Sequence, residues 1–273
     1  MNFNQICKDI KSLKIQGAEN VAIAAVKAYS LNPTKEAVKK LISLRPTEPA
    51  LRNALKFVQL NKKNINLALA HLTQSRKIAT EIASRLIKNN SIVYTHCHSS
   101  TVNMALIEAK KNGKHFEVYC TETRPFMQGR MTASDLSKAK IPVTFFVDSA
   151  MRLAIKEADI CFIGADAVTN DLKVINKIGS ELAADSASHF EIPFYVLTDS
   201  WKFDPKTIFG FEEEIEKRSY KEVWENPPKG VKIDNYVFEK INPNAITAIV
   251  SELGILSPQN FMIKVLEKYP WMI

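Results

Sequence analysis

The chain has 273 residues, of which 46% are hydrophobic and 24% are charged, which is enough for a sizeable core and two domains. It contains no run of about 18 apolar residues and no apolar core of a signal peptide near the N-terminus, so we expect a soluble, cytoplasmic protein. The four cysteines are scattered and form no CxxC pair. This spacing indicates neither a disulfide framework nor a zinc ribbon.

Positive charge is concentrated in the first third of the chain. Residues 1–90 hold 16 Lys+Arg and 5 Asp+Glu, a balance of +11, which leaves −3 of the total +8 for residues 91–273. Such a basic lobe suits a polyanion, either nucleic acid or a phosphorylated metabolite. The alternative is that the helices simply expose a lysine-rich surface to solvent, which would give the same excess of positive charge. The basic residues are not interleaved with aromatic residues that could stack on bases.

The first 90 residues are predicted to be entirely helical. Apolar residues recur there at helical spacing, and Gly17, Asn32-Pro33 and Arg45-Pro46 interrupt the pattern. The expected helices cover residues 6–13, 21–29, 35–44, 51–60 and about 65–88. We therefore expect an N-terminal helical domain over residues 1–90.

After residue 90, short apolar runs alternate with helical segments. The runs are residues 92–97, 116–120, 143–147, 160–163 and 194–197, and the helical segments are 102–111, 132–138, 149–157 and 174–189. This alternation predicts an α/β domain over residues 91–273 with a Rossmann-like, doubly wound, mostly parallel sheet. Residues 203–239 show few periodic signals, and residues 243–253 are interpreted as a closing helix that ends at Gly254.

Unusual residues cluster after the predicted strands, and ligands of such sheets bind beyond the carboxyl ends of strands. Three of the eight glycines, Gly129, Gly164 and Gly179, fall in these loops. The loops comprise residues 96–100, 121–129, 164–166 with 176–179, and 199–202.

The segment Tyr94–Thr101 joins the first strand directly to a helix. Ser99, Ser100 and Thr101 can cap that helix and offer hydroxyls beside its free N–H groups, as in a phosphate-binding site. Cys97 closes the strand beside the positive end of the helix, where we expect a lowered thiol pKa.

Cys97 and Asp166 follow different strands, so the sheet could place them on opposite sides of one crevice as base and acid. Taken singly, a strand cysteine is more often a small core residue, and Asp166 could cap the next turn. His96 and His98 flank Cys97, but neighbours in a strand point to opposite faces. The three side chains are therefore not expected to share one metal ion.

Several cations could hold phosphate groups. Asn176-Lys177 is predicted to open a helix, and Lys177, Lys202 and Arg45 supply positive charges. Each of these alone could be an ordinary surface charge. The turn at Gly17-Ala18 could be a hinge or could present N–H groups to an anion.

Together these motifs resemble a known superfamily over nearly the whole chain. It contains archaeal ribose 1,5-bisphosphate isomerase, methylthioribose-1-phosphate isomerase and the regulatory subunits of eukaryotic initiation factor two B. The resemblance is carried by residues 95–97, 122–125 with 128–129, 147–150, 164–166 and 176–179. A cysteine after the first strand and an aspartate in the Gly-Ala-Asp loop are typical of the two isomerases, and this chain has Cys97 and Asp166.

The resemblance favours the ribose 1,5-bisphosphate branch. It implies conversion of α-D-ribose 1,5-bisphosphate to D-ribulose 1,5-bisphosphate in nucleoside monophosphate degradation, with no metal or redox cofactor, by a homo-oligomer built from dimers. It implies Cys97 as proton acceptor and Asp166 as proton donor. The implied substrate contacts are Gly17, Ala18, Arg45, Ser99, Ser100, Thr101, Asn176, Lys177 and Lys202.

Two other functions remain open. One is a regulatory subunit that binds a sugar phosphate or nucleotide and other proteins, and the other is methylthioribose-1-phosphate isomerase. Cys97 and Asp166 count against the regulatory subunit, and the cationic residues, Arg45 included, favour a bisphosphate over the methylthio sugar. The sequence departs from the superfamily at Gln16, where an arginine is usual, and at Glu239, where an aspartate is usual.

Overall fold

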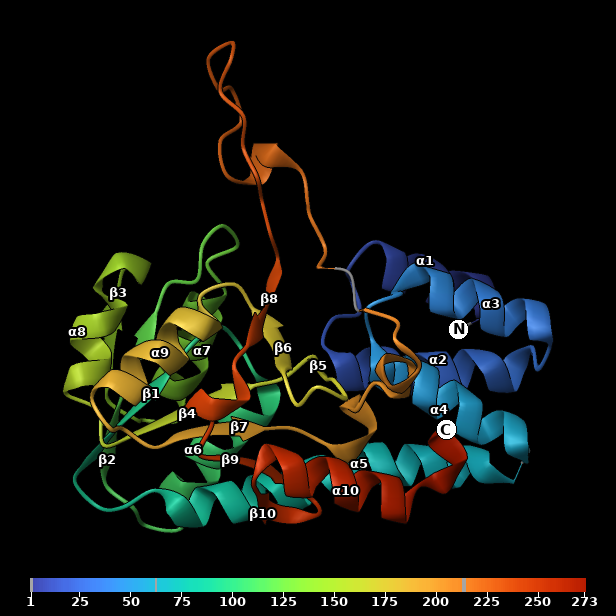
Figure 1. Cartoon of the computed structure of the whole chain (residues 1–273), viewed down its shortest axis with the longest axis horizontal. Coiled ribbons are helices and arrows are strands. Elements are labelled where there is room, and N and C mark those ends of the chain that lie inside the picture. The colour runs from blue at the N-terminus through green and yellow to red at the C-terminus, as the bar shows by residue number, and fades with distance from the viewer. Residues whose placement is uncertain (1, 62, 213–214) are drawn as a thin grey trace.

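The computed structural model describes every residue except 1, 62, 213 and 214. Before the first strand, the described residues form the helices expected from the sequence (Figure 1). They are α1 (Phe3–Lys11), α2 (Ala18–Leu31), α3 (Lys35–Leu44), α4 (Pro49–Leu60) and α5 (Asn64–Leu86). Local signals account for the starts of two of them, since Thr34 accepts the N–H of Ala37 at the start of α3 and Pro49 occupies the first turn of α4.

The described part of the second half contains a seven-stranded sheet with the order β10-β9-β7-β4-β1-β2-β3. All neighbouring strands are parallel except the β9–β10 pair. The strands are β1 (Ser91–Thr95), β2 (Phe116–Thr121), β3 (Val143–Phe146), β4 (Ile160–Gly164), β7 (Phe194–Leu197), β9 (Ala248–Ser251) and β10 (Gly254–Leu256). The predicted mostly parallel α/β fold is confirmed.

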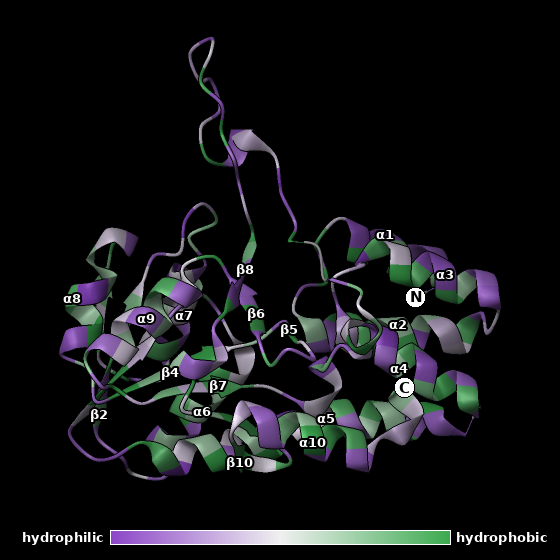
Figure 2. Ribbon diagram, viewed as in Figure 1, coloured by the Kyte–Doolittle hydropathy of each residue, from purple (hydrophilic) through white to green (hydrophobic). Residues whose placement is uncertain are grey.

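Helices cover both faces of this sheet. Val93 and Tyr94 of β1 are both fully buried, but they belong to different cores because successive strand residues point to opposite faces. Val93 packs with the end of α5 and with α6 (Ser100–Lys111), whereas Tyr94 joins the core that includes α8 (Met151–Lys156) and α9 (Ser180–His189). In Figure 2 the hydrophobic colour is concentrated on the strands, and the helices carry mixed bands.

The predicted helix over residues 174–189 is wrong in its first part. Val174–Lys177 is strand β6, which pairs antiparallel with β5 (Ala167–Val168) and β8 (Phe238–Ile241) in a second, small sheet. Val174 and Ile175 are β-branched and buried, and they favour a strand. Gly179, with φ of 97°, then turns the chain into α9.

The predicted closing helix over residues 243–253 is also wrong. A short 3₁₀ turn, Pro243–Ala245, leads into β9, which is buried at every position between β7 and β10. Gly254 has φ of 113° and begins β10 directly after the two-residue turn from β9, instead of ending a helix. The closing helix is α10 (Pro258–Lys268).

Residues 203–239, predicted to be irregular, form 3₁₀ turns at Pro205–Phe209 and Tyr220–Glu222 and an arm that projects from the body in Figure 1. Residues 213 and 214 of this segment lie outside the described residues. The remaining helix, α7 (Gln128–Lys138), follows β2. Within the described residues, no helix is long and apolar enough to span a membrane.

Candidate active site

The carboxyl ends of β1, β2 and β4 lie side by side, because β1 pairs in parallel with both other strands. The loops that leave these ends carry Cys97, Thr123 and Asp166 respectively. The topology therefore brings the two predicted catalytic residues to the same edge of the sheet.

The backbone around Cys97 is held on both sides. Its φ is 68°, a left-handed conformation two residues beyond the end of β1. Its N–H donates to Thr123 Oγ1 at 3.0 Å, and its carbonyl accepts from Thr132 Oγ1 at 2.8 Å. The thiol Sγ lies 3.5 Å from Oε1 of Gln128. These contacts fix the direction of the thiol.

The predicted lowering of the Cys97 thiol pKa is wrong for the substrate-free protein. Burial raises the pKa of Cys97 to about 11, and the positive charge of Lys177 opposes this shift only in part. The negative charges of Asp166 and Asp148 contribute to the same rise. Because the Cys97 side chain is only 8% exposed, desolvation raises the thiol pKa by more than the positive end of the nearby helix can lower it. At neutral pH the thiol is therefore mainly protonated.

Asp166 lies between β4 and β5 and is only partly exposed. Its backbone N–H donates to the carbonyl of Ile175 at 2.9 Å, which ties the loop to β6. Burial raises the pKa of the Asp166 carboxyl, while Lys202, Lys177 and Arg45 act in the opposite direction. A carboxyl that keeps its proton above its usual range is suited to donate it.

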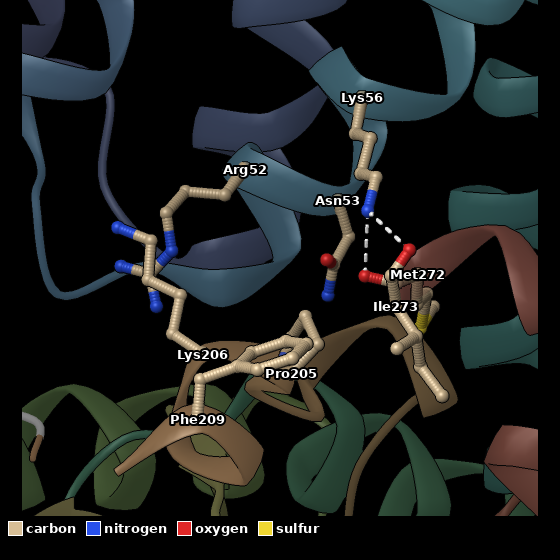
Figure 3. Close-up of a pocket in the computed structure, with 8 residues that line it drawn as sticks. All are labelled: Arg52, Asn53, Lys56, Pro205, Lys206, Phe209, Met272 and Ile273. Atoms are coloured by element: carbon tan, nitrogen blue, oxygen red, sulfur yellow. Dashed lines mark hydrogen bonds between the residues drawn. The ribbon is translucent and has the colours of Figure 1, made fainter. Parts of the chain in front are cut away.

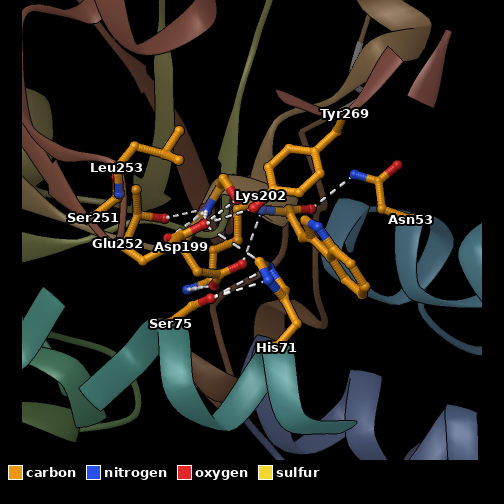
Figure 4. Close-up of polar contacts among 12 residues, drawn as sticks. Asn53, His71, Ser75, Asp199, Lys202, Ser251, Glu252, Leu253 and Tyr269 are labelled. Carbon is orange, nitrogen blue, oxygen red and sulfur yellow. Dashed lines mark hydrogen bonds and ion pairs between the residues drawn. The ribbon is translucent and has the colours of Figure 1, made fainter. Parts of the chain in front are cut away.

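The three predicted phosphate-binding cations all lie near Asp166. Lys202 Nζ donates to the carbonyl of Ala165 at 2.7 Å and lies 4.0 Å from Asp199 Oδ2 (Figure 4). Lys177 is buried, with Nζ 4.9 Å from the centre of the Phe238 ring. The structure therefore gathers positive charge from β6, α3 and the turn after β7.

One of the predicted contacts, Asn176, has another local role. Asn176 and Lys177 lie on β6 and do not open a helix, contrary to the prediction. The Asn176 amide donates to Ser180 Oγ at 2.9 Å and so supports the first turn of α9. Glu239, on the neighbouring strand, accepts the N–H of Glu181 at 2.7 Å and caps the same helix.

The hydroxyl residues lie at the start of α6. Ser99 caps this helix, as predicted, because its Oγ accepts from the N–H of Val102 at 3.4 Å. Ser100 is exposed and Thr101 is buried. A Cβ at Gly164 would lie 2.7 Å from Ser99 Oγ, so only glycine allows the end of β4 to approach this cap so closely.

Gly17 and Ala18 open α2, with φ of 83° at Gly17. Gln16 directs its amide to the carbonyl of Leu13 at 2.6 Å. One residue after Ala18, Glu19 lies close enough to Lys202 that this lysine lowers its pKa, although burial raises the pKa overall.

Sequence reasoning missed the roles of two buried residues. His96 forms hydrogen bonds with Thr121 Oγ1 and the carbonyl of Ile178, each at 2.8 Å, and burial lowers its pKa. The neutral ring therefore connects the end of β2 to the turn before α9. A Cβ at Gly179 would lie 2.8 Å from His96 Nε2, which explains this glycine. Glu48, at the start of α4, pairs with Arg45. The sequence signal that could have identified Glu48 is its position directly before the proline that opens α4.

A cavity of ≈ 200 Å³ lies elsewhere, and its lining contains none of the predicted site residues (Figure 3). Lys56 projects toward it from α4, but Lys56 Nζ donates to the carbonyls of Met272 and Ile273 at 2.7 and 3.1 Å. This cavity is part of the contact between α4 and the last turn of the chain.

Comparison with known proteins identifies relatives of this chain. A Methanocaldococcus jannaschii protein named ribose 1,5-bisphosphate isomerase is 38% identical, over 95% of this chain and 92% of the relative. A Pyrococcus furiosus protein named putative translation initiation factor eIF-2B subunit 2-like is 29% identical, over 95% of this chain and 98% of the relative. A crystal structure of Pyrococcus horikoshii translation initiation factor eIF-2B superposes with a TM-score of 0.82 at 26% identity, covering 94% of this chain and 98% of that one.

A comparison with protein families places the chain in the same group as these relatives, because residues 31–258 match the initiation factor 2 subunit family. The matched range includes Cys97, Asp166 and the three cations around them. The predicted superfamily is confirmed, and the chain belongs to the initiation factor 2 subunit family.

Proposed function

We propose that this protein is an aldose–ketose isomerase that converts α-D-ribose 1,5-bisphosphate to D-ribulose 1,5-bisphosphate. The observation that carries the proposal is the placement of a buried thiol and a partly buried carboxyl at neighbouring strand ends, with Arg45, Lys177 and Lys202 acting on the carboxyl. The name of the 38% identical relative supports the same reaction.

Asp166 is the proposed acid. The substrate is closed as a ring, so the ring oxygen must gain a proton when its bond to C1 breaks. The raised pKa of Asp166 keeps a proton available for this step.

Cys97 is the proposed base. Its thiolate removes the proton from C2, and the electron pair of that C–H bond forms a C1–C2 double bond as the ring bond to C1 breaks. The Cys97 thiol then returns a proton to C1, and the Asp166 carboxylate takes the proton of the C2 hydroxyl. This gives the ketone and restores both residues, so no atom is gained or lost overall. Because the thiol pKa is about 11 in the substrate-free protein, only a small fraction is thiolate at neutral pH.

Two phosphate groups bring up to about four negative charges into the site. Arg45, Lys177 and Lys202 are the proposed charged contacts, and the capped start of α6 offers N–H and hydroxyl donors. The full set of proposed contacts is Gly17, Ala18, Arg45, Ser99, Ser100, Thr101, Asn176, Lys177 and Lys202.

We further propose that the enzyme works in the cytoplasm, in nucleoside monophosphate degradation, as a homo-oligomer built from dimers. Support for self-association comes from exposed apolar side chains near the edge strand β3. Phe145, Val147 and Leu153 are 41%, 53% and 66% exposed. Burial of these apolar side chains against a second copy of the chain would be favourable.

The test is incubation with ribose 1,5-bisphosphate and detection of the ketose bisphosphate, with methylthioribose 1-phosphate as a comparison substrate. Formation of ribulose 1,5-bisphosphate in preference to the methylthio ketose supports the proposal. Turnover of the methylthio sugar alone would replace it with the related isomerase.

The second candidate is a regulatory subunit that binds a sugar phosphate or nucleotide. The relatives named for eIF-2B favour it, at 29% sequence identity and with a TM-score of 0.82 for the solved structure. Binding of sugar phosphate without any turnover would support this candidate.

A further inference from the structure

The His96 ring is buried and has a hydrogen bond at each nitrogen. It is 2% exposed, with Nδ1 2.8 Å from Thr121 Oγ1 and Nε2 2.8 Å from the carbonyl oxygen of Ile178. A carbonyl oxygen can only accept, so Nε2 carries the proton and Nδ1 accepts from the Thr121 hydroxyl. The Thr121 oxygen can then accept from the Tyr94 hydroxyl, 3.3 Å away. A single tautomer of His96 therefore satisfies all of these contacts.

The bond from His96 to Ile178 joins the two sheets. His96 directly precedes Cys97 after β1 of the large sheet, whereas Ile178 directly follows Lys177, the last residue of β6 in the small sheet. Bonds such as that from the Ile178 N–H to the carbonyl of Val237 hold the end of β6 to the segment before β8, but not to β1. His96 therefore fixes the end of β6 relative to the strand end that carries Cys97.

This contact leaves no free space on either side of the ring. A Cβ at Gly179 would lie 2.8 Å from His96 Nε2 and 2.9 Å from Cε1, so the ring lies directly against the backbone of the turn. On the other side, the Cys97 N–H donates to Thr123 Oγ1 at 3.0 Å, and the Thr123 hydroxyl lies 3.4 Å from the carbonyl oxygen of Thr121. The thiol-bearing residue, the ring and the turn after Lys177 are therefore held in one fixed arrangement.

We propose that His96 is a positioning residue that holds Lys177 near the Cys97 thiol through its Nε2–H bond to Ile178. The inference rests on the proposed function and deepens it, because it links the base to one of the proposed phosphate contacts. Burial raises the pKa of Cys97 to about 11, and the charge of Lys177 is the largest influence that opposes this rise. Loss of the bond to Ile178 lets Lys177 move away, so a smaller fraction of Cys97 is thiolate.

Two substitutions of His96 separate its two hydrogen bonds. A glutamine amide reaches as far as Nε2 and can donate to Ile178, whereas an asparagine amide reaches only as far as Nδ1 and can accept from Thr121. We expect His96→Gln to keep the wild-type reactivity of Cys97 and His96→Asn to lose it. If the ring only fills space in the core, both variants behave alike, and that result overturns the proposal.

The measurement is the rate at which iodoacetamide alkylates Cys97 in the substrate-free protein near pH 8, read from the Cys97 peptide by mass spectrometry. The thiolate is the reacting species. Each unit of rise in the thiol pKa lowers the rate by about threefold, after allowance for the greater reactivity of a more basic thiolate. We expect His96→Asn to react about threefold or more slowly than wild type. Loosening of the site alone exposes the thiol and speeds the reaction, so an equal or faster rate overturns the proposal.

A double-mutant cycle tests whether His96 acts through Lys177. In Lys177→Ala the charge is already absent, so the addition of His96→Asn is expected to cause no further fall in the alkylation rate. We expect the same lack of additivity in kcat/KM for ketose formation. A further fall of the size seen in the wild-type background would show that His96 acts through another group, and would overturn the proposal.

Gly179→Ala disturbs the same contact without changing His96. The added Cβ pushes against the ring, so we expect the slow alkylation of His96→Asn, and again no effect in the Lys177→Ala background. This variant decides the question if His96→Asn does not fold, and wild-type alkylation in folded Gly179→Ala would contradict the inference. If wild type forms no ketose, the proposed function fails, and the alkylation rates still decide the role of His96.

Discussion

At the scale of single residues, Cys97 and Asp166 carry the proposed chemistry. Cys97→Ser is expected to lower kcat by at least about 10²–10⁴-fold, because a serine hydroxyl cannot accept the C2 proton at neutral pH. The measurement is ketose formation, with thermal stabilisation by substrate as the check on binding. Cys7→Ser, in α1, is the matched control and is expected to stay active. Near-normal turnover in Cys97→Ser would refute the assignment.

Asp166→Asn keeps the shape of the acid but cannot donate the ring-opening proton. We expect a loss of kcat of about 10²–10⁴-fold with substrate binding retained, because Arg45, Lys177 and Lys202 remain. Loss of substrate-induced stabilisation together with activity would show instead that Asp166 is needed for binding.

Lys202→Ala is expected to weaken substrate binding by about 1.5–3 kcal/mol, the usual contribution of a hydrogen bond to a charged group. Lys206→Ala removes an exposed lysine four residues later and is the control. Calorimetric titration with the sugar bisphosphate gives both affinities. Equal affinity in the two variants would exclude Lys202 from the contact set.

The sequence predicted the position of Cys97 and Asp166 at the ends of neighbouring strands, but not the protonation state of Cys97. Cys97 was expected to be acidic because a helix start follows it, but burial dominates and raises its pKa to about 11. Burial of one side chain depends on residues far away in the sequence, such as Gln128, which lies against the thiol, and Thr132, which holds the carbonyl of Cys97. The burial of Glu48 was missed for the same reason, because it also depends on residues that are far away in the sequence.

At the scale of elements, α7 begins unusually close to the end of β2. A Cβ at Gly129 would lie 1.7 Å from the carbonyl oxygen of Thr121. Gly129→Ala must therefore move the start of α7 and with it Gln128, which contacts the Cys97 thiol. We expect a loss of stability of at least about 1–3 kcal/mol by urea unfolding, together with reduced turnover. Ser134→Ala, exposed on the same helix, should change stability by less than about 0.5 kcal/mol.

The elements that sequence patterns misassigned were short segments with ambiguous periodicity. Val174–Lys177 continues into a helical pattern but is stabilised as a strand by pairing with β8, more than 60 residues later. β9 is apolar enough for a buried helix, and only its place beside β7 defines it as a strand. By contrast, α3 and β7 were predicted with their observed bounds because their signals are local.

At the scale of the whole molecule, the division into residues 1–90 and 91–273 remains our proposal. The end of α5 nevertheless packs into the same core as β1 and α6, and His71 of α5 stacks on Trp201 with ring centres 4.0 Å apart. We therefore expect the two parts to unfold in one calorimetric transition. Two separated transitions would show that they are energetically independent.

The positive charge of the N-terminal helices is partly used inside the molecule. Arg52 pairs with Asp204 at 3.0 Å, Arg76 with Glu19 at 3.0 Å, and Arg45 lies beside Glu48. We propose that the remaining charge serves the metabolite and that nucleic acid is not a partner. Tight, strongly salt-dependent binding of RNA, without a response to sugar bisphosphates, would reverse this interpretation.

The most direct measurement is a ³¹P and ¹³C NMR time course of wild type and Cys97→Ser with α-D-ribose 1,5-bisphosphate labelled with ¹³C at C2. We predict that wild type converts the C2 signal of the aldose to the ketone carbon of ribulose 1,5-bisphosphate with both phosphates retained. Under the same conditions Cys97→Ser should leave the substrate unchanged. An unchanged C2 signal with wild type, at protein concentrations where the sugar bisphosphate is bound, would contradict the isomerase assignment.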